Sequence, residues 1–149
     1  MAEVRPGDAL LHPVPLAAIG VLLLNDHVLK AAYPGFVTGK LSDVAGLVFF
    51  PLFLVSAFEV VEARFGARWR PKRAVLLAAV VATATVFALV QIWAPATWLY
   101  RFGLGALQWP FVAVAGGAFR PVVVMADPTD LVTVPAVLVA WWIGRRRTA

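Results

Sequence analysis

One apolar stretch decides the class of the protein, and it reads LSDVAGLVFFPLFLVSAFEVV over residues 41–61. Its length matches the ~20 mostly apolar residues that an α-helix needs to cross the hydrocarbon core of a bilayer. Comparable spans are predicted on either side of it, over 13–32, 74–93 and 128–144, the last if its helix begins at Pro128. We therefore predict an all-α integral membrane protein, with residues 1–149 forming a single membrane domain built as a four-helix transmembrane bundle.

The composition excludes several other classes of protein. Of the 149 residues, 62% are hydrophobic and 14% are charged, against roughly 45–50% and about 25% in soluble globular proteins. Such a chain is neither an ordinary cytosolic enzyme nor intrinsically disordered. It contains no cysteine, which excludes structural disulfides, thiolate catalysis and metal centres with cysteine ligands.

The basic residues set the expected orientation in the membrane. They cluster in the loop after the second span and in the tail, at Arg64, Arg68, Arg70, Lys72, Arg73, Arg145, Arg146 and Arg147. By the positive-inside tendency both regions are cytoplasmic, which requires an even number of spans between them. We therefore expect a multi-pass cell-membrane protein, in a Gram-negative inner membrane by its residue usage, with both termini in the cytoplasm. No basic surface is left over for nucleic acid, so the expected partners are the lipid bilayer and either a larger membrane complex or a homo-oligomer.

The apolar segment 97–120, between the third and fourth spans, then cannot cross the membrane. We expect it to lie on the outer face, in the interface or as a re-entrant hairpin that turns at its glycines and proline. These breakers are Gly103, Gly105, Pro110, Gly116 and Gly117.

Ionisable residues near the outer ends of the spans are the most informative polar feature. An ionisable residue within a membrane segment costs about 2.5–3.5 kcal/mol on insertion scales. Yet the outer ends of the first, second and fourth spans carry Asn25, Asp26, His27, Lys30, Lys40, Asp43, Asp127 and Asp130. The four carboxylates outnumber the two lysines, and an acidic excess of this kind favours a cation.

This layer has both a chemical and a structural interpretation. Chemically, the catalytic groups or ligands of a divalent metal would be Asp26, His27, Asp43 and Asp130, with Asn25, Lys30, Lys40 and Asp127 as binding residues. Structurally, Asp26 and Lys30 have the i, i+4 spacing of a helix ion pair. Asp127 before Pro128 is typical of a helix N-cap, and Thr38 or Ser42 would cap the second span.

Three functions follow from these alternatives. The first is a non-enzymatic accessory or structural protein, in which the polar layer holds the helices together or docks a larger complex. The second is a metal-dependent or acid–base enzyme acting at the outer face. The third is ion or proton translocation, for which the spans offer few polar groups between the outer layer and Glu59. At the cytoplasmic end, Glu59 and Glu62 are expected to pair with the nearby Arg64 and Arg68.

Overall fold

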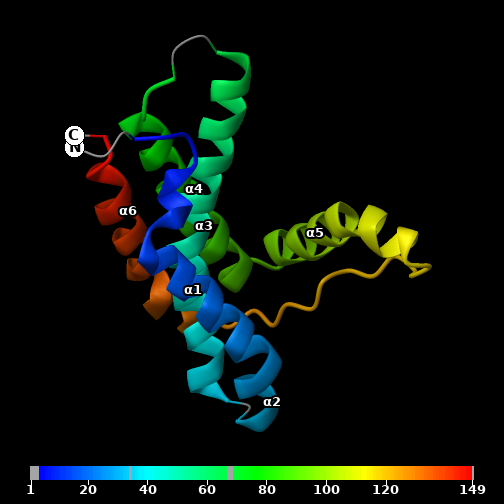
Figure 1. Cartoon of the computed structure of the whole chain (residues 1–149). Helices are drawn as coiled ribbons and strands as arrows, with labels where there is room; N and C mark the ends of the chain where they lie inside the picture. Colours follow the sequence, from blue (N-terminus) through cyan, green and yellow to red (C-terminus); the bar gives the residue numbers. More distant parts are fainter. Residues whose placement is uncertain (1–3, 34, 67–68, 149) are drawn as a thin grey trace. The chain divides into compact units, whose positions relative to one another are not determined.

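The computed structural model describes residues 4–33, 35–66 and 69–148 of the chain, and its regular elements are helices throughout (Figure 1). In chain order they are η1 (Asp8–Leu11), α1 (Pro13–Leu24), η2 (Asn25–Leu29), α2 (Lys30–Ala32), α3 (Phe36–Phe65), α4 (Arg73–Ile92), α5 (Ala94–Val114), η3 (Pro128–Ala136) and α6 (Val137–Arg145). No strand occurs among these described residues, which confirms the all-helical prediction.

Three helical segments are long and apolar enough to cross a membrane. They are Pro13–Ala32, Phe36–Phe65 and Arg73–Ile92, at the three places where the sequence predicts the first three spans. The second is longer than predicted, because α3 begins five residues before Leu41 and continues past Val61. Its proline, Pro51, lies buried within the helix without ending it.

The fourth predicted span, residues 128–144, forms two elements in succession. A 3₁₀-helix, η3, runs to Ala136 and the α-helix α6 then begins at Val137. Pro135 lies at this junction, and proline has no N–H to donate to the preceding turn. The region is helical as predicted, but it is not one continuous α-helix.

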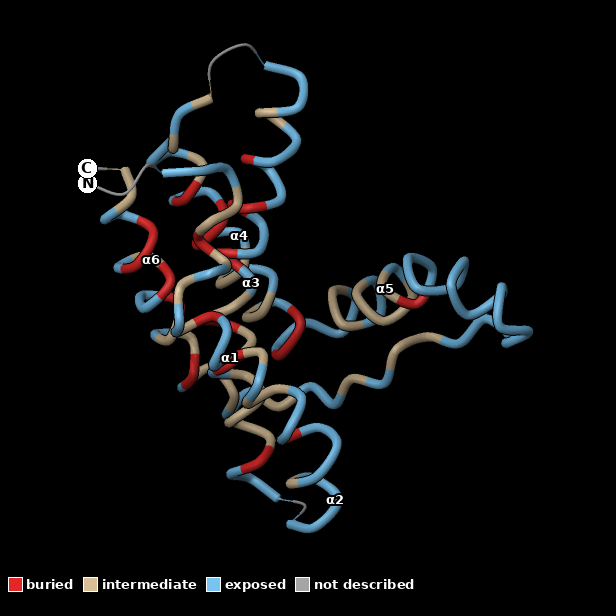
Figure 2. The backbone as a smooth tube through the Cα atoms, viewed as in Figure 1, coloured by how far each residue is buried: buried red, intermediate tan, exposed pale blue. Residues whose placement is uncertain are grey.

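The chain divides into two compact units, one formed by residues 1–84 and 132–149 and the other by residues 85–131. In the first unit, the helices pack through small residues. Ala18 of α1 is buried with Ala45 of α3, and Ala140 of α6 is buried with Leu52 of α3. Figure 2 shows the buried parts of these helices in red. At Gly144 of α6, an added Cβ would lie 2.5 Å from Leu76 of α4, so these two helices approach closely only because the residue is glycine.

In the second unit, α5 is followed by an extended segment that returns along it. The helix continues through Gly103, Gly105 and Pro110, so the expected turn does not occur there. The chain turns at Gly116, another of the expected breakers, whose φ of 78° is a backbone conformation that favours glycine. The Val122 N–H then donates to the carbonyl oxygen of Arg101 at 3.0 Å.

Candidate functional site

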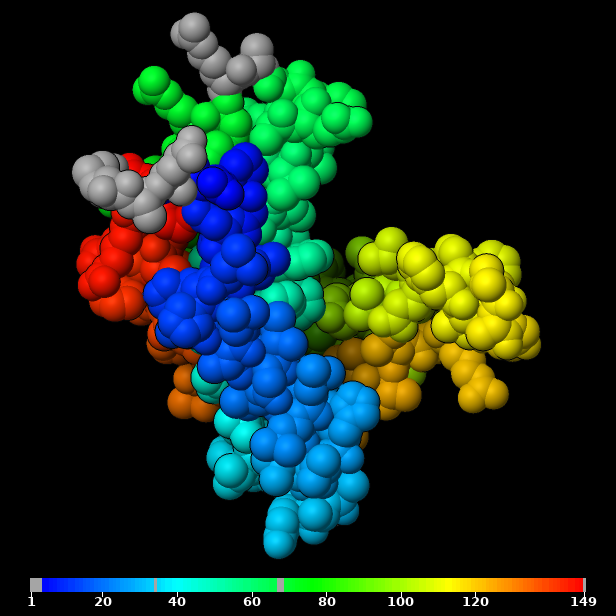
Figure 3. Space-filling view, in the orientation of Figure 1, coloured from blue at the N-terminus to red at the C-terminus, as the bar shows by residue number. Residues whose placement is uncertain are grey.

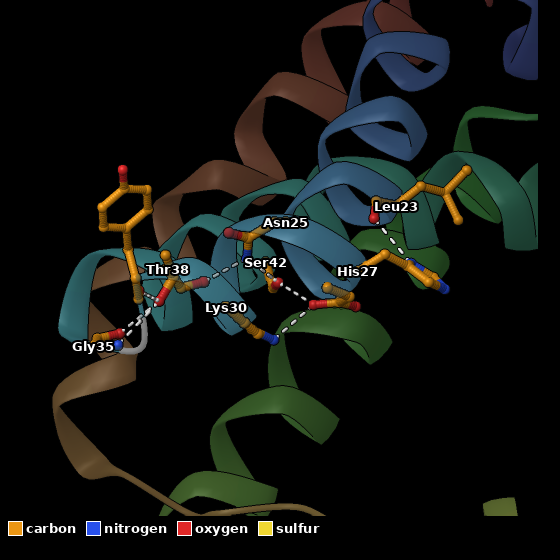
Figure 4. A network of polar contacts seen from close by, with 9 residues as sticks. Leu23, Asn25, His27, Lys30, Gly35, Thr38 and Ser42 are labelled. Carbon is orange, nitrogen blue, oxygen red and sulfur yellow. Dashed lines mark hydrogen bonds and ion pairs between the residues drawn. The ribbon is translucent and has the colours of Figure 1, made fainter.

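The polar network around Asn25, the outer network by its predicted side of the membrane, is built around a single π-helical turn, η2, at Asn25–Leu29 in the first predicted span. Such turns insert one extra residue into an α-helix and occur frequently at functional sites. Asn25 is completely buried at this point. Its Nδ2 donates to the carbonyl oxygen of Thr38 at 2.6 Å and to Oγ of Ser42 at 2.7 Å (Figure 4). One amide group thus connects the first span to two consecutive turns of α3.

Asp26 extends this network towards the surface. Its Oδ1 accepts hydrogen bonds from Ser42 Oγ at 2.8 Å and from Lys30 Nζ at 2.7 Å. The predicted i, i+4 pair of Asp26 and Lys30 is therefore present, with both side chains a little under half exposed. Ser42 joins Asn25 to Asp26, so that amide, hydroxyl, carboxylate and ammonium groups form one continuous series.

Thr38 closes the turn that leads into α3. Its hydroxyl accepts a hydrogen bond from the Gly35 N–H at 3.2 Å and lies within donating distance of the Gly35 and Tyr33 carbonyl oxygens. The N-cap of α3 is Gly35, and Thr38, predicted as a possible cap, lies in the first turn, where its hydroxyl binds the Gly35 N–H. Thr38 also supplies the carbonyl group that Asn25 binds.

The remaining predicted residues of this hairpin also have interaction partners. The His27 ring Nδ1 lies 2.9 Å from the carbonyl oxygen of Leu23, one turn earlier (Figure 4). Nζ of Lys40 lies 4.4 Å from the centroid of the Phe36 ring. Asp43 lies in the second turn of α3 and also has an interaction partner in the folded chain.

Asp127 and Asp130 lie in the second unit, where both contact a glutamine. The Thr129 N–H donates to Asp127 Oδ1 at 2.9 Å, which confirms that Asp127 caps the helix beginning at Pro128. Gln91, at the end of α4, donates through Nε2 to Asp130 Oδ2 and accepts the Asp127 N–H through Oε1, each at 3.0 Å. Gln91 is 6% exposed, and a lone amide at the end of an apolar span was the available signal for this role.

These positions bear directly on the proposed metal site. Among the residues that the structure describes, no three His, Asp or Glu side chains are grouped closely enough to hold a metal ion. Asp26 and His27 make separate contacts, while Asp130 belongs to the other compact unit. A single layer uniting Asp26, His27, Asp43 and Asp130 therefore stays a prediction.

A second buried polar cluster joins the two ends of the first unit, and sequence reasoning missed it. Glu59 of α3 is 3% exposed. It accepts hydrogen bonds from the Gly7 N–H at 3.0 Å and from both terminal nitrogens of Arg147 at 3.1 Å. Arg147 also pairs with Asp8 and donates to the carbonyl oxygen of Arg5. The early and late parts of the chain therefore meet at α3, where Figure 3 shows the dark blue and red segments side by side.

The ion pairs at this end differ from those expected. The partner of Glu59 comes from the tail, 88 positions along the chain, and Glu62 pairs with Lys72 at the start of the next helix. Neighbouring basic residues in the sequence suggested Arg64 and Arg68, but Arg68 lies outside the described residues. The packing of η1 and α6 against Leu52 of α3 brings the tail to Glu59.

The chemistry of both networks is that of groups bound directly to one another. In the outer network, each carboxylate or hydroxyl oxygen named above is already bonded to a neighbouring donor, and the Glu59 carboxylate is neutralised by a guanidinium.

Comparison of the chain with family models, with curated proteins and with solved structures gave no match.

Proposed function

We propose that the chain is a small multi-pass membrane protein with an accessory or structural role, in which buried polar networks hold the helices in register. The observation that carries this proposal is the position of Asn25, which is wholly buried and donates twice to α3. In a bilayer core no water replaces a lost hydrogen bond, so an amide bridge of this kind connects two helices specifically.

The contacts at the other end support the proposed topology. Gly7 and Arg147 both donate to Glu59, so these early and late residues lie together near the C-terminal end of α3. An even number of spans puts both termini on the same side of the membrane, and this contact is consistent with that. We propose that the chain crosses an inner membrane four times. Both termini then lie in the cytoplasm, and the Asn25 network lies towards the outer face.

A comparison of Ser42→Ala with His27→Ala separates the structural role from a metal site. Ser42 bonds both Asn25 and Asp26, so its loss is expected to cost about 1 kcal/mol and to lower the melting temperature. His27 binds only the carbonyl oxygen of its own helix among its described contacts, so its replacement should leave the melting temperature unchanged. Thermal unfolding of both purified variants measures this difference.

Metal analysis of the same preparations tests the alternative, a metal site in this network. If the role is structural, a chelator and added Zn²⁺, Mg²⁺ or Mn²⁺ should not shift the melting temperature, because no ion binds the folded state preferentially. One equivalent of metal per chain that is lost in His27→Ala or Asp26→Asn would overturn the proposal in favour of an outer-face metalloenzyme.

A further inference from the structure

The second compact unit contains a cavity between α5 and the extended segment that returns along it. Its volume is about 380 Å³, and its lining includes Gly105, Gln108, Trp109, Val112, Ala118 and Arg120. Two contacts hold the extended segment in place, since Arg101 both accepts from the Val122 N–H and donates through Nε to the Val122 carbonyl oxygen. At Gly105 an added Cβ would lie 2.7 Å from the Arg120 carbonyl oxygen, so glycine permits this close approach.

Arg120 lines the cavity and is exposed. In the part of the chain that the structure describes, no carboxylate pairs with the Arg120 guanidinium. The two carboxylates of this unit, Asp127 and Asp130, contact Gln91 and the start of η3. A guanidinium presents several donors in a fixed geometry that suits phosphate and carboxylate oxygens.

The rest of the wall, and the helix beside it, are apolar. Trp109 and Val112 line the cavity, and Leu107, Phe111 and Val114 of the same helix are each at least 70% exposed. Exposure of several large apolar residues on one helix is unfavourable in water. It is favourable at the boundary between lipid headgroups and acyl chains. A tryptophan beside a cationic side chain is typical of that depth.

We propose that this cavity binds the headgroup of an anionic phospholipid. Arg120 and the side-chain amide of Gln108 take the phosphate, Trp109 and Val112 cover the glycerol, and the acyl chains lie over Leu107 and Phe111. The volume agrees with this assignment. It is at the lower end of the roughly 300–1,000 Å³ of small-molecule sites, so it accommodates a headgroup but not two acyl chains.

The test uses the full-length protein in an uncharged detergent with four soluble probes. These are dihexanoyl phosphatidylglycerol, dihexanoyl phosphatidylcholine, hexanoate and inorganic phosphate, and isothermal titration calorimetry measures their binding. We expect the phosphatidylglycerol to bind about tenfold more tightly than the other three, because only it combines a net negative phosphate with apolar chains. Inorganic phosphate or hexanoate binding equally well would overturn the lipid assignment.

Two variants localise the binding, and a third controls for charge. Arg120→Gln is expected to weaken phosphatidylglycerol binding about tenfold, by loss of a charge-assisted hydrogen bond. Ala118→Leu fills the cavity without changing the charge and should weaken it similarly. Arg64→Gln removes the same charge from an exposed position of α3 and should have no effect. Unchanged binding in both cavity variants, or equal weakening in Arg64→Gln, would overturn the proposal.

Discussion

Replacing Glu59 with glutamine is expected to lower the free energy of unfolding by about 3 kcal/mol, the largest effect of any single substitution considered. The variant keeps the size of the side chain but leaves Arg147, 14% exposed, without its main counter-charge. Breaking a buried ion pair from one side costs about 3–5 kcal/mol because the remaining charge stays desolvated. We expect the lower end of that range, since Asp8 still pairs with Arg147.

The matched control is Glu62→Gln, one turn further along α3. Glu62 pairs with Lys72 through side chains that are 26% and 51% exposed, and exposed pairs contribute about 1 kcal/mol or less. Unfolding of both variants by a denaturing detergent in mixed micelles measures the two losses. Equal losses in Glu59→Gln and Glu62→Gln would show that the contact between the two ends of the chain does not stabilise the fold.

Replacing Asn25 with alanine is expected to cost about 2 kcal/mol, the second-largest effect. Two hydrogen bonds are lost, each contributing about 0.6–1.5 kcal/mol, and a small cavity remains. Part of the loss is offset because Asn25 Oδ1 is buried and accepts no hydrogen bond from the described part of the chain. Mixed-micelle unfolding again provides the measurement.

A double-mutant cycle with Ser42→Ala tests whether the two residues act together. Because Asn25 Nδ2 donates to Ser42 Oγ, removing both side chains should cost less than the sum of the single losses. Strict additivity would mean that the hydrogen bond between Asn25 and Ser42 contributes nothing. The exposed Asp26–Lys30 pair is not expected to compensate, since ion pairs of this type contribute a few tenths of a kcal/mol.

Local features of the structure could be predicted from the sequence because they depend on spacing along one helix. The apolar lengths of the first three spans, the i, i+4 pair of Asp26 and Lys30, and the Asp127 cap before Pro128 are all of this kind. Each depends only on residues within one helix, so no knowledge of the neighbouring helices is required.

The contacts that sequence reasoning missed depend on how separate elements pack. Glu59 meets Arg147 because η1 and α6 both pack against α3, and nearby arginines in the sequence suggested closer partners. Asn25 rather than Asp26 is the buried member of the outer network, because the π-helical turn determines which side chain faces α3. Gln91 lies beside Asp127 and Asp130 because the segment after α5 returns towards the end of α4. The hydrophobic periodicity of the sequence does not reveal this return.

The most direct test of the central claim is labelling of single cysteines with a membrane-impermeant maleimide in intact cells. The chain has no native cysteine, so Tyr33→Cys, Arg70→Cys and Thr148→Cys each report one position without background. The proposed topology predicts that Tyr33→Cys, at the hairpin beside the Asn25 network, is labelled at once, and that the other two react only after permeabilisation. Labelling of Tyr33→Cys and Thr148→Cys from the same side of the membrane would contradict the account.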